Sequence, residues 1–183
     1  MTNQELILGV MRAQGKADAL DLRARAPELD GTALIDEENK IPVFDGSKDY
    51  TSWKAGSPVR ELVDGEWQVF TLITPHNASS YPGSTPSNTP ALWSIRHTKD
   101  PKRAKPWLAP NGTSGLYELD ECATENGHVY QNGHDNNEFS PSALPERWTD
   151  LGTIEEVQGA LCSRRRQQHR SRGAAFFVPF WRG

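Results

Sequence analysis

The fold is decided by a stretch in the first half of the chain, VRELVDGEWQVFTLIT at residues 59–74. Its two halves are rich in β-branched, aromatic and aliphatic side chains, and they flank the dipeptide Asp64-Gly65. An Asp-Gly pair between two such runs is the strongest short signal for a hairpin with a two-residue turn. We therefore expect one strand at residues 59–63 and a second at residues 67–74.

The residues around this hairpin complete a small β unit, residues 41–98. The stretch at 75–90 is rich in Ser, Thr, Asn and Pro, which is typical of an ordered loop. Residues 91–95, ALWSI, are expected to return as a short third strand. The sequence thus predicts a three-stranded antiparallel module.

A second unit, residues 107–152, shows the same order of features. A strand is expected near residues 119–123, followed by the turn Asn126-Gly127 and a strand at 128–131. A polar loop and a closing tryptophan follow. We predict a second three-stranded antiparallel module here.

Aligned by eye on their turns, the two units correspond loosely. The matches are Gly65-Glu66-Trp67 with residues 127–130, His76-Asn77 with residues 135–137, and Trp93 with Trp148. The spacing from turn glycine to tryptophan is 28 residues in the first unit and 21 in the second. We interpret the pair as a degenerate tandem repeat, joined by a basic linker at residues 99–106.

Residues 1–40 are expected to form a helix and a charged connection. Thr2 and Glu5 have the spacing of a capping box, and Pro27 ends the helical pattern. Apolar residues follow at three- and four-residue steps: Leu6, Val10, Ala13, Ala17 and Leu20. So narrow a stripe must pack on the body or on copies of itself. We favour self-association into a homo-oligomer; the alternative is one helix laid over a single domain.

The composition favours small, turn-rich units over a large enzyme. Of the 183 residues, 36% are hydrophobic, and 15 are Gly and 13 Pro, whereas ordinary domains are roughly 45% apolar. No apolar run reaches the about 18 residues that cross a bilayer, and the start does not resemble a secretory signal. The two cysteines, Cys122 and Cys162, are typical of a protein made in a reducing cytoplasm.

The net charge of −4 hides an uneven distribution. Six arginines and no acidic residue follow Glu156, so the rest of the chain is more acidic than the total suggests. An acidic body repels nucleic acid, which is not expected as a partner. The basic and aromatic tail, residues 153–183, could touch phosphates or a membrane surface. A solvated tail, or one held by a partner subunit, is the favoured reading.

The sequence contains no recognisable catalytic machinery. Histidine–glutamate zinc motifs, nucleophile elbows, P-loops and dinucleotide fingerprints are absent from it. Asp120 and Glu121 are adjacent, so on a strand they would point to opposite faces. A metal cluster of His128 and His134 with Cys122 and Asp135 is less favoured than ordinary positions on a turn-rich surface. We expect no catalytic residue, metal or cofactor, and therefore no enzyme.

The aromatic residues are more informative. The chain has six Trp, four Tyr and six Phe, more than two small cores need, and many lie beside loops rich in Asn, Asp, Ser and Thr. A flat ring stacks on the C–H face of a sugar while side-chain amides bind its hydroxyls. Trp93 and Trp148 are expected in the cores. The predicted glycan-binding residues are Trp67, Tyr130, Tyr81, Phe139, Asn77 and Asn136.

Several motifs together resemble a known family. They are WKAGSPV at 53–59, DGEW at 64–67, PHN at 75–77, PGSTP at 82–86, PALW at 90–93, ENGHVY at 125–130, DNN at 135–137, FSP at 139–141 and WTDLG at 148–152. Residues 41–152 thereby resemble two carbohydrate-binding modules of family 5/12, the chitin-binding type 3 kind. Leu72-Ile73 and Asn132-Gly133 stand where chitin-binding members have two tryptophans. The resemblance implies small β modules that recognise a glycan, but not crystalline chitin.

A helix followed by two such modules is similar to small tail or baseplate-region proteins of phages that infect Gram-positive bacteria. The resemblance implies a non-enzymatic virion accessory protein for host attachment, made in the bacterial cytoplasm. Its expected partners are host cell-wall or surface polysaccharide, other tail proteins and further copies of itself. Two alternatives stay open: a purely structural virion protein, and a binding subunit detached from a chitinase or lytic enzyme.

Overall fold

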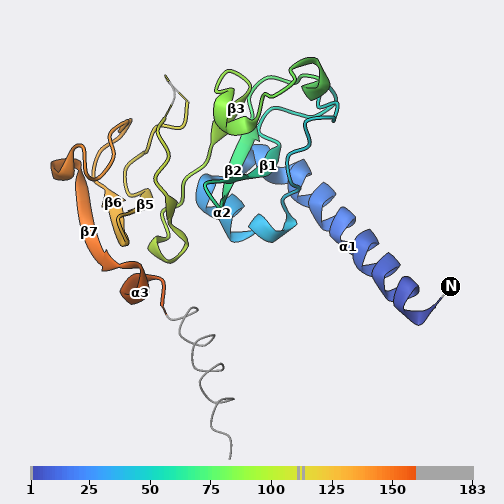
Figure 1. The fold of residues 1–183 in the computed structure, drawn as a ribbon, viewed down its shortest axis with the longest axis horizontal. Helices are drawn as coiled ribbons and strands as arrows, with labels where there is room; N and C mark the ends of the chain where they lie inside the picture. Colours follow the sequence, from blue (N-terminus) through green and yellow to red (C-terminus); the bar gives the residue numbers. More distant parts are fainter. Residues whose placement is uncertain (1, 111, 113, 160–183) are drawn as a thin grey trace, which may run out of the picture.

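The computed structural model describes residues 2–110, 112 and 114–159. It contains an N-terminal helix and two sheets, of three strands in the order β1-β2-β3 and four in the order β4-β5-β6-β7 (Figure 1). The prediction of a mainly β chain with an N-terminal helix is confirmed, although the second sheet has one strand more than expected. The predictions for Cys162 and for the tail at 160–183 lie outside the described residues.

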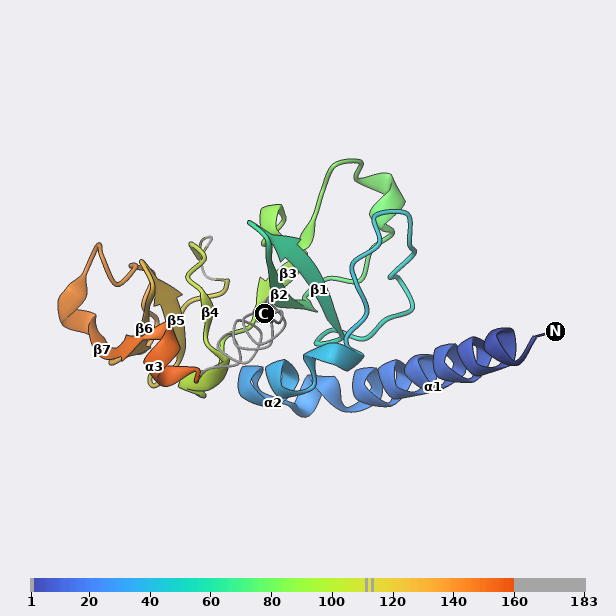
Figure 2. The ribbon, with the colours of Figure 1, turned by 60° about the horizontal axis from the view of Figure 1, so that its bottom comes forward.

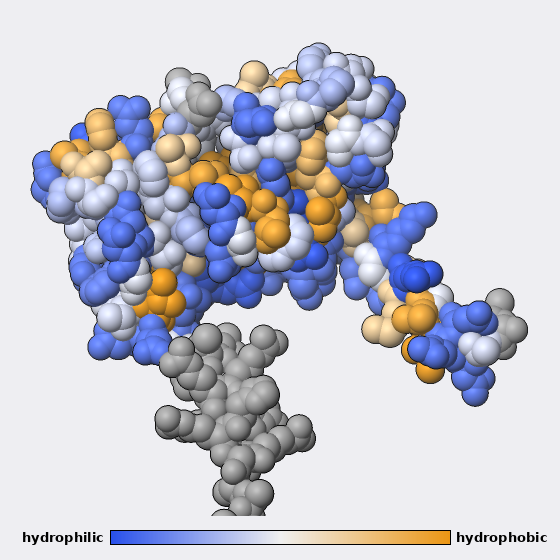
Figure 3. All heavy atoms as spheres, in the orientation of Figure 1, coloured by the Kyte–Doolittle hydropathy of each residue, from blue (hydrophilic) through white to orange (hydrophobic). Residues whose placement is uncertain are grey.

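Helix α1, Asn3–Arg25, begins with the expected capping box between Thr2 and Glu5. Leu22 is its one buried residue, and the N-terminal part of the helix extends from the body as a rod (Figure 1). Apolar side chains lie among hydrophilic ones along that rod (Figure 3). No helix in the described part of the chain is both long and apolar enough to cross a membrane.

The connection after α1 is more structured than the charged link that we expected. It contains a 3-10 turn at Ala26–Glu28, helix α2 at Gly31–Asp36 and a second 3-10 turn at Glu38–Lys40. Asp30 caps α2 by accepting a hydrogen bond from the amide of Ala33 at 2.8 Å. A helix of six residues is too short to leave a readable apolar period, so the sequence did not indicate it.

The first sheet consists of β1 (Pro58–Val63), β2 (Glu66–Leu72) and β3 (Trp93–Ile95), all antiparallel. Asp64 and Gly65 both have positive φ, 51° and 86°, as the predicted two-residue turn requires. One face of β2 packs Phe70 and Leu72 into an aromatic core. On the other face, Val69 joins the core formed by the N-terminal helices. The sheet is therefore covered on both sides.

The second sheet consists of β4 (Lys105–Pro106), β5 (Cys122–Glu125), β6 (His128–Asn132) and β7 (Trp148–Thr153). A one-turn helix, α3, follows at Ile154–Val157. The unexpected strand is β4, which pairs parallel to β5 inside the stretch that we interpreted as a linker. Two residues, one of them proline, leave no strand pattern in a sequence.

The two sheets stand side by side, with α1 and α2 beneath the first (Figure 2). Contacts from residues 99–106 hold them together. Lys105 Nζ is 2.7 Å from a carboxylate oxygen of Glu38, and Gln68 Nε2 donates to the carbonyl of Pro106 at 3.2 Å. The predicted linker is thus packed against the N-terminal segment and both sheets.

Candidate functional site

The two units share a distinctive contact between a strand and a loop. In the first, Glu61 of β1 accepts hydrogen bonds from the amide and hydroxyl of Ser87, at 2.9 and 3.1 Å. In the second, Glu125 of β5 accepts the same two bonds from Ser142, at 2.8 and 3.1 Å. We call each of these a Glu–Ser clasp. Both serines belong to segments that align without a gap, TPSNTPALW at 85–93 and SPSALPERW at 140–148.

The aromatic cores of the two units are also alike. Tyr50 meets Trp93 edge-on with ring centroids 5.3 Å apart, and Tyr117 meets Trp148 edge-on at the same distance. Each tyrosine hydroxyl accepts a hydrogen bond from a backbone amide of the preceding segment. All four rings are buried, as expected for the two tryptophans. These rings hold the units together and are closed to ligand.

The strand pairing corrects the alignment made by eye. Trp93 lies opposite Leu72, and Trp148 lies opposite Asn132. If Leu72 of β2 is matched with Asn132 of β6, Tyr130 corresponds to the buried Phe70. Trp67 then has no counterpart in β6. The first hairpin is two residue pairs longer at its turn, and a hairpin can lengthen there without disturbing the rest of its pairing. The turns were therefore the wrong points of alignment.

Trp67 and Tyr130 consequently occupy different environments. Trp67 is half-buried on the face of β2 that carries Val69, and the guanidinium of Arg60 lies 4.7 Å from its ring centroid. Tyr130 is half-buried against the core of Tyr117 and Trp148. The structure does not bring these two predicted residues to equivalent positions.

Tyr81 and Phe139, by contrast, lie in the same loop of the two units, and both rings are open to solvent. Tyr81 is 50% exposed and Phe139 is 41% exposed. Tyr81 meets the ring of His76 edge-on at 6.0 Å, while the guanidinium of Arg147 lies 5.6 Å from the Phe139 centroid. Each loop therefore presents one supported aromatic ring to the outside.

Asparagines hold the start of both loops. Asn77 Oδ1 accepts hydrogen bonds from the amide and hydroxyl of Ser79, at 3.1 and 2.8 Å. Its counterpart is Asn137, whose Oδ1 accepts from the amide of Phe139 at 3.1 Å. Asn137 is fully buried, whereas the predicted Asn136 is exposed with a φ of 55°. Asn77 thus acts at least as a loop support, and Asn136 faces elsewhere.

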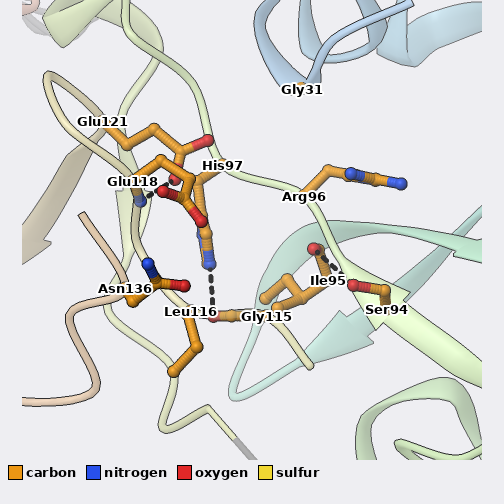
Figure 4. A pocket seen from close by; sticks show the side chains of 10 residues that line it. All are labelled: Gly31, Ser94, Ile95, Arg96, His97, Gly115, Leu116, Glu118, Glu121 and Asn136. Atoms are coloured by element: carbon orange, nitrogen blue, oxygen red, sulfur yellow. Dashed lines mark hydrogen bonds between the residues drawn. The ribbon is translucent and has the colours of Figure 1, made fainter. Parts of the chain in front are cut away.

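Asn136 lines a pocket of about 210 Å³ at the junction of the units. Figure 4 places Asn136, Glu118 and Glu121 together on one side, with Arg96 extending away from them. Burial raises the pKa of Glu121. In the described part of the chain, the lining contains no Trp, Tyr or Phe. The pocket offers carboxylates, an amide and a hydroxyl, so it could bind polar groups but not stack a sugar ring.

His97 forms the floor of this pocket and is structural. Its ring stacks on Tyr117 with centroids 3.6 Å apart, and Nε2 is 2.9 Å from the carbonyl oxygen of Gly115. Burial lowers the pKa of His97 to about 4. The imidazole is therefore neutral at pH 7, and it joins the first unit to the second through an aromatic stack.

The histidine and cysteine positions do not form a metal site in the described residues. No group of three or more His, Cys, Asp or Glu side chains there is placed to hold an ion. His128 instead pairs with Asp150 at 3.0 Å, and burial raises the pKa of Cys122 to about 12.

Comparisons of the chain with protein-family models and with curated proteins found no match.

Proposed function

We propose that this chain is a non-enzymatic accessory protein of a phage tail or baseplate that binds a glycan on the host cell surface. One observation carries the proposal. Two units built alike present an exposed ring, Tyr81 or Phe139, on the same loop. Each loop is held at one end by an asparagine and at the other by a Glu–Ser clasp.

Such a loop suits a shallow sugar site. The ring contributes apolar area for the C–H face of a pyranose, and polar side chains beside it orient the hydroxyls. Because both ends of the loop are already fixed, little conformational entropy is lost on binding. One site of this kind binds at roughly millimolar to micromolar Kd, so several must act together.

Assembly through α1 would supply the further copies. The part of the stripe from Leu6 to Ala17 alternates four- and three-residue steps, the spacing of a coiled-coil seam. Leu6 and Val10 are 56% and 63% exposed. The buried Leu22 lies on roughly the opposite side of the helix, at 3.6 residues per turn. Copies joined along the stripe would keep their sheets on the outside, and multivalency adds about 10²–10⁴ in avidity.

The test is retention on purified cell walls of Gram-positive bacteria. The variant Tyr81→Ala plus Phe139→Ala should lose retention, because both exposed rings are removed. Leu62→Ala is the matched control, since Leu62 is an exposed apolar residue at 54% on the opposite face of the first sheet. Its retention should equal that of the wild type. Equal retention of all three proteins would remove the glycan-binding assignment.

A purely structural role is the second candidate, and it is favoured by the surface around Trp67. Trp67 pairs across the hairpin with the exposed Leu62 and lies under Arg60. A half-buried indole with an arginine and an exposed leucine is a composition that protein interfaces favour. Trp67→Ala tests this candidate: it should impair incorporation into tail particles while cell-wall retention of the isolated protein is kept.

A further inference from the structure

A second cavity, of about 410 Å³, lies between α1 and the first unit. Leu20, Ile41, Pro42 and Trp53 give it an apolar floor. Four cationic side chains surround that floor: Lys16, Arg23, Lys40 and Lys48. Among the residues that the structure describes, its lining includes no aspartate or glutamate, although the whole chain has 24 acidic residues against 20 basic ones. The cavity is therefore a local reversal of the charge of the protein.

Three of these cations are outside the salt bridges of the described residues. Lys40 is paired with Glu37 at 2.6 Å, but within the described residues Lys16, Arg23 and Lys48 make no salt bridge. The guanidinium of Arg23 and the ammonium of Lys48 lie 4.4 and 4.3 Å from the ring centroid of Trp53. Two like charges are thus held over one indole.

The electrostatics of Lys48 reflect this crowding. Burial lowers the pKa of Lys48 and the charge of Arg23 lowers it further, while the nearby carboxylate of Asp45 offsets part of this shift. A nearby anion would favour the charged form of Lys48 and offset the repulsion between Lys48 and Arg23. Charge-assisted hydrogen bonds to carboxylate or phosphate oxygens are also roughly twice as strong as neutral ones.

We propose that this cavity binds the anionic group of a charged saccharide unit, a carboxylate or a phosphate ester. The cations would hold the anion, and the apolar floor would contact the C–H groups of the attached carbon skeleton. The volume lies in the range of small-molecule pockets, roughly 300–1,000 Å³. The identity of the ligand as a saccharide rests on the proposed function. If the proposed function holds, the host polymer is an acidic polysaccharide. The cavity is then a binding site separate from the exposed loops.

Calorimetric titration of the full chain tests the proposal with glucose 6-phosphate, glucuronate and glucose. At low salt we expect heat of binding from at least one of the two anions and none from glucose. The stronger of the two anions identifies phosphate or carboxylate as the natural group. Binding should weaken as sodium chloride is added, because salt screens charge–charge attraction.

Variants assign the binding to the cavity. Lys16→Gln and Lys48→Gln, singly and together, should weaken binding of the preferred anion, the double variant about tenfold or more, which corresponds to about 1.4 kcal/mol. Lys54→Gln is the matched control, because Lys54 is an exposed lysine next to Trp53 that does not line the cavity. Lys16 is exposed on α1, so its substitution leaves the core intact if Lys48→Gln perturbs folding.

Two results would overturn this site. One is glucose 6-phosphate and glucuronate giving no more heat than glucose. The other is that Lys54→Gln weakens anion binding as much as the cavity variants do. Binding would then depend on the general positive potential of the surface, and the cations over Trp53 would have a purely structural role. The Tyr81→Ala plus Phe139→Ala variant separates the glycan-binding loops from the anion-binding cavity. It should no longer be retained on cell walls, but it should still bind the anion. Cell-wall retention that depends on the rings without anion binding would leave only the proposed function standing.

Discussion

Two Glu–Ser clasps fix the loops on which the proposed function depends. Each carboxylate takes a backbone amide and a hydroxyl at once, so it ties a loop to a strand through a single side chain. Serine, proline and tryptophan recur at the same spacing in 85–93 and 140–148. That recurrence is present in the sequence and indicates the repeat, but it is not seen when the two units are aligned on their turns.

Removal of a clasp should destabilise its unit. We expect Glu61→Ala to lower the free energy of unfolding by about 1–2 kcal/mol, because two hydrogen bonds to a charged group are lost. Glu125→Ala should cost less, because the hydrogen bonds of its clasp are exposed to solvent and those of Glu61 are partly buried. Urea denaturation measures both. Glu66→Ala, at an exposed position beside the turn, is the control and should change the free energy little; an equal loss there would deny the clasp any special contribution.

His97 should make the stability depend on pH. Its pKa falls from 6.5 to about 4 in the folded chain because the ring is buried. Between these values the unfolded state binds the proton and the folded state does not, so stability is full above pH 6.5 and is lost as the pH falls toward 4. The loss should be of the order of 1–3 kcal/mol. In urea titrations at several pH values, His97→Gln should reduce the change in the free energy of unfolding between pH 6.5 and 4. An unchanged pH dependence would contradict the assignment of this effect to His97.

At the scale of elements, α1 combines two separate faces. Near its end, Leu22 enters the core with Leu34 and Ile41, which fixes the helix to the first unit. The apolar stripe from Leu6 to Ala17 stays in solvent. A helix with an exposed seam of this period is stable when a second helix covers it.

A pair of single substitutions separates the two sides of the rod. Val10→Glu places a charge in the stripe and should reduce the mass in light scattering to that of one chain. Leu8→Glu makes the same kind of change at an exposed residue on the other side of the helix, and it should leave the mass of the assembly unchanged. A wild-type mass equal to one chain would end the assembly role.

The elements that the sequence predicted are those with local signals. The capping box at Thr2 and the Asp-Gly and Asn-Gly turns depend on neighbours within a few residues, and all three are present. Helix α2 and strand β4 are held by tertiary contacts and are too short to show a period. The half-burial of Trp67 and Tyr130 depends on distant residues, so the sequence could not rank them below Tyr81 and Phe139.

At the scale of the whole molecule, the segment at 99–106 decides how the two units sit together. Arg103 lies near Asp36, and Lys105 pairs with Glu38 where both side chains are largely shielded from water. The stack of His97 on Tyr117 adds a contact on another side of the junction. Because the two units are fixed to each other, the loops that carry Tyr81 and Phe139 keep a constant distance. Under the proposed function, that distance would match the repeat of a polymer.

Breaking the Lys105–Glu38 pair should loosen the junction. We expect Lys105→Gln to reduce the free energy of unfolding by about 1–3 kcal/mol, since Glu38 would be left largely buried without its closest cation. Thermal unfolding followed by circular dichroism measures the loss. Lys102→Gln, at an exposed neighbouring lysine, is the control. A variant at position 105 as stable as this control would show that the pair does not hold the units together.

We propose that one ring in each unit contacts the sugar, and aromatic NMR signals report on this contact directly. Oligosaccharides released from host cell walls would be titrated into the full chain carrying ¹³C-labelled Tyr and Phe. We expect concentration-dependent shifts of the Tyr81 and Phe139 ring signals, while the signals of the buried Tyr50 and Tyr117 stay unchanged. Fragments that are retained by the protein and yet leave both exposed rings unshifted would contradict it.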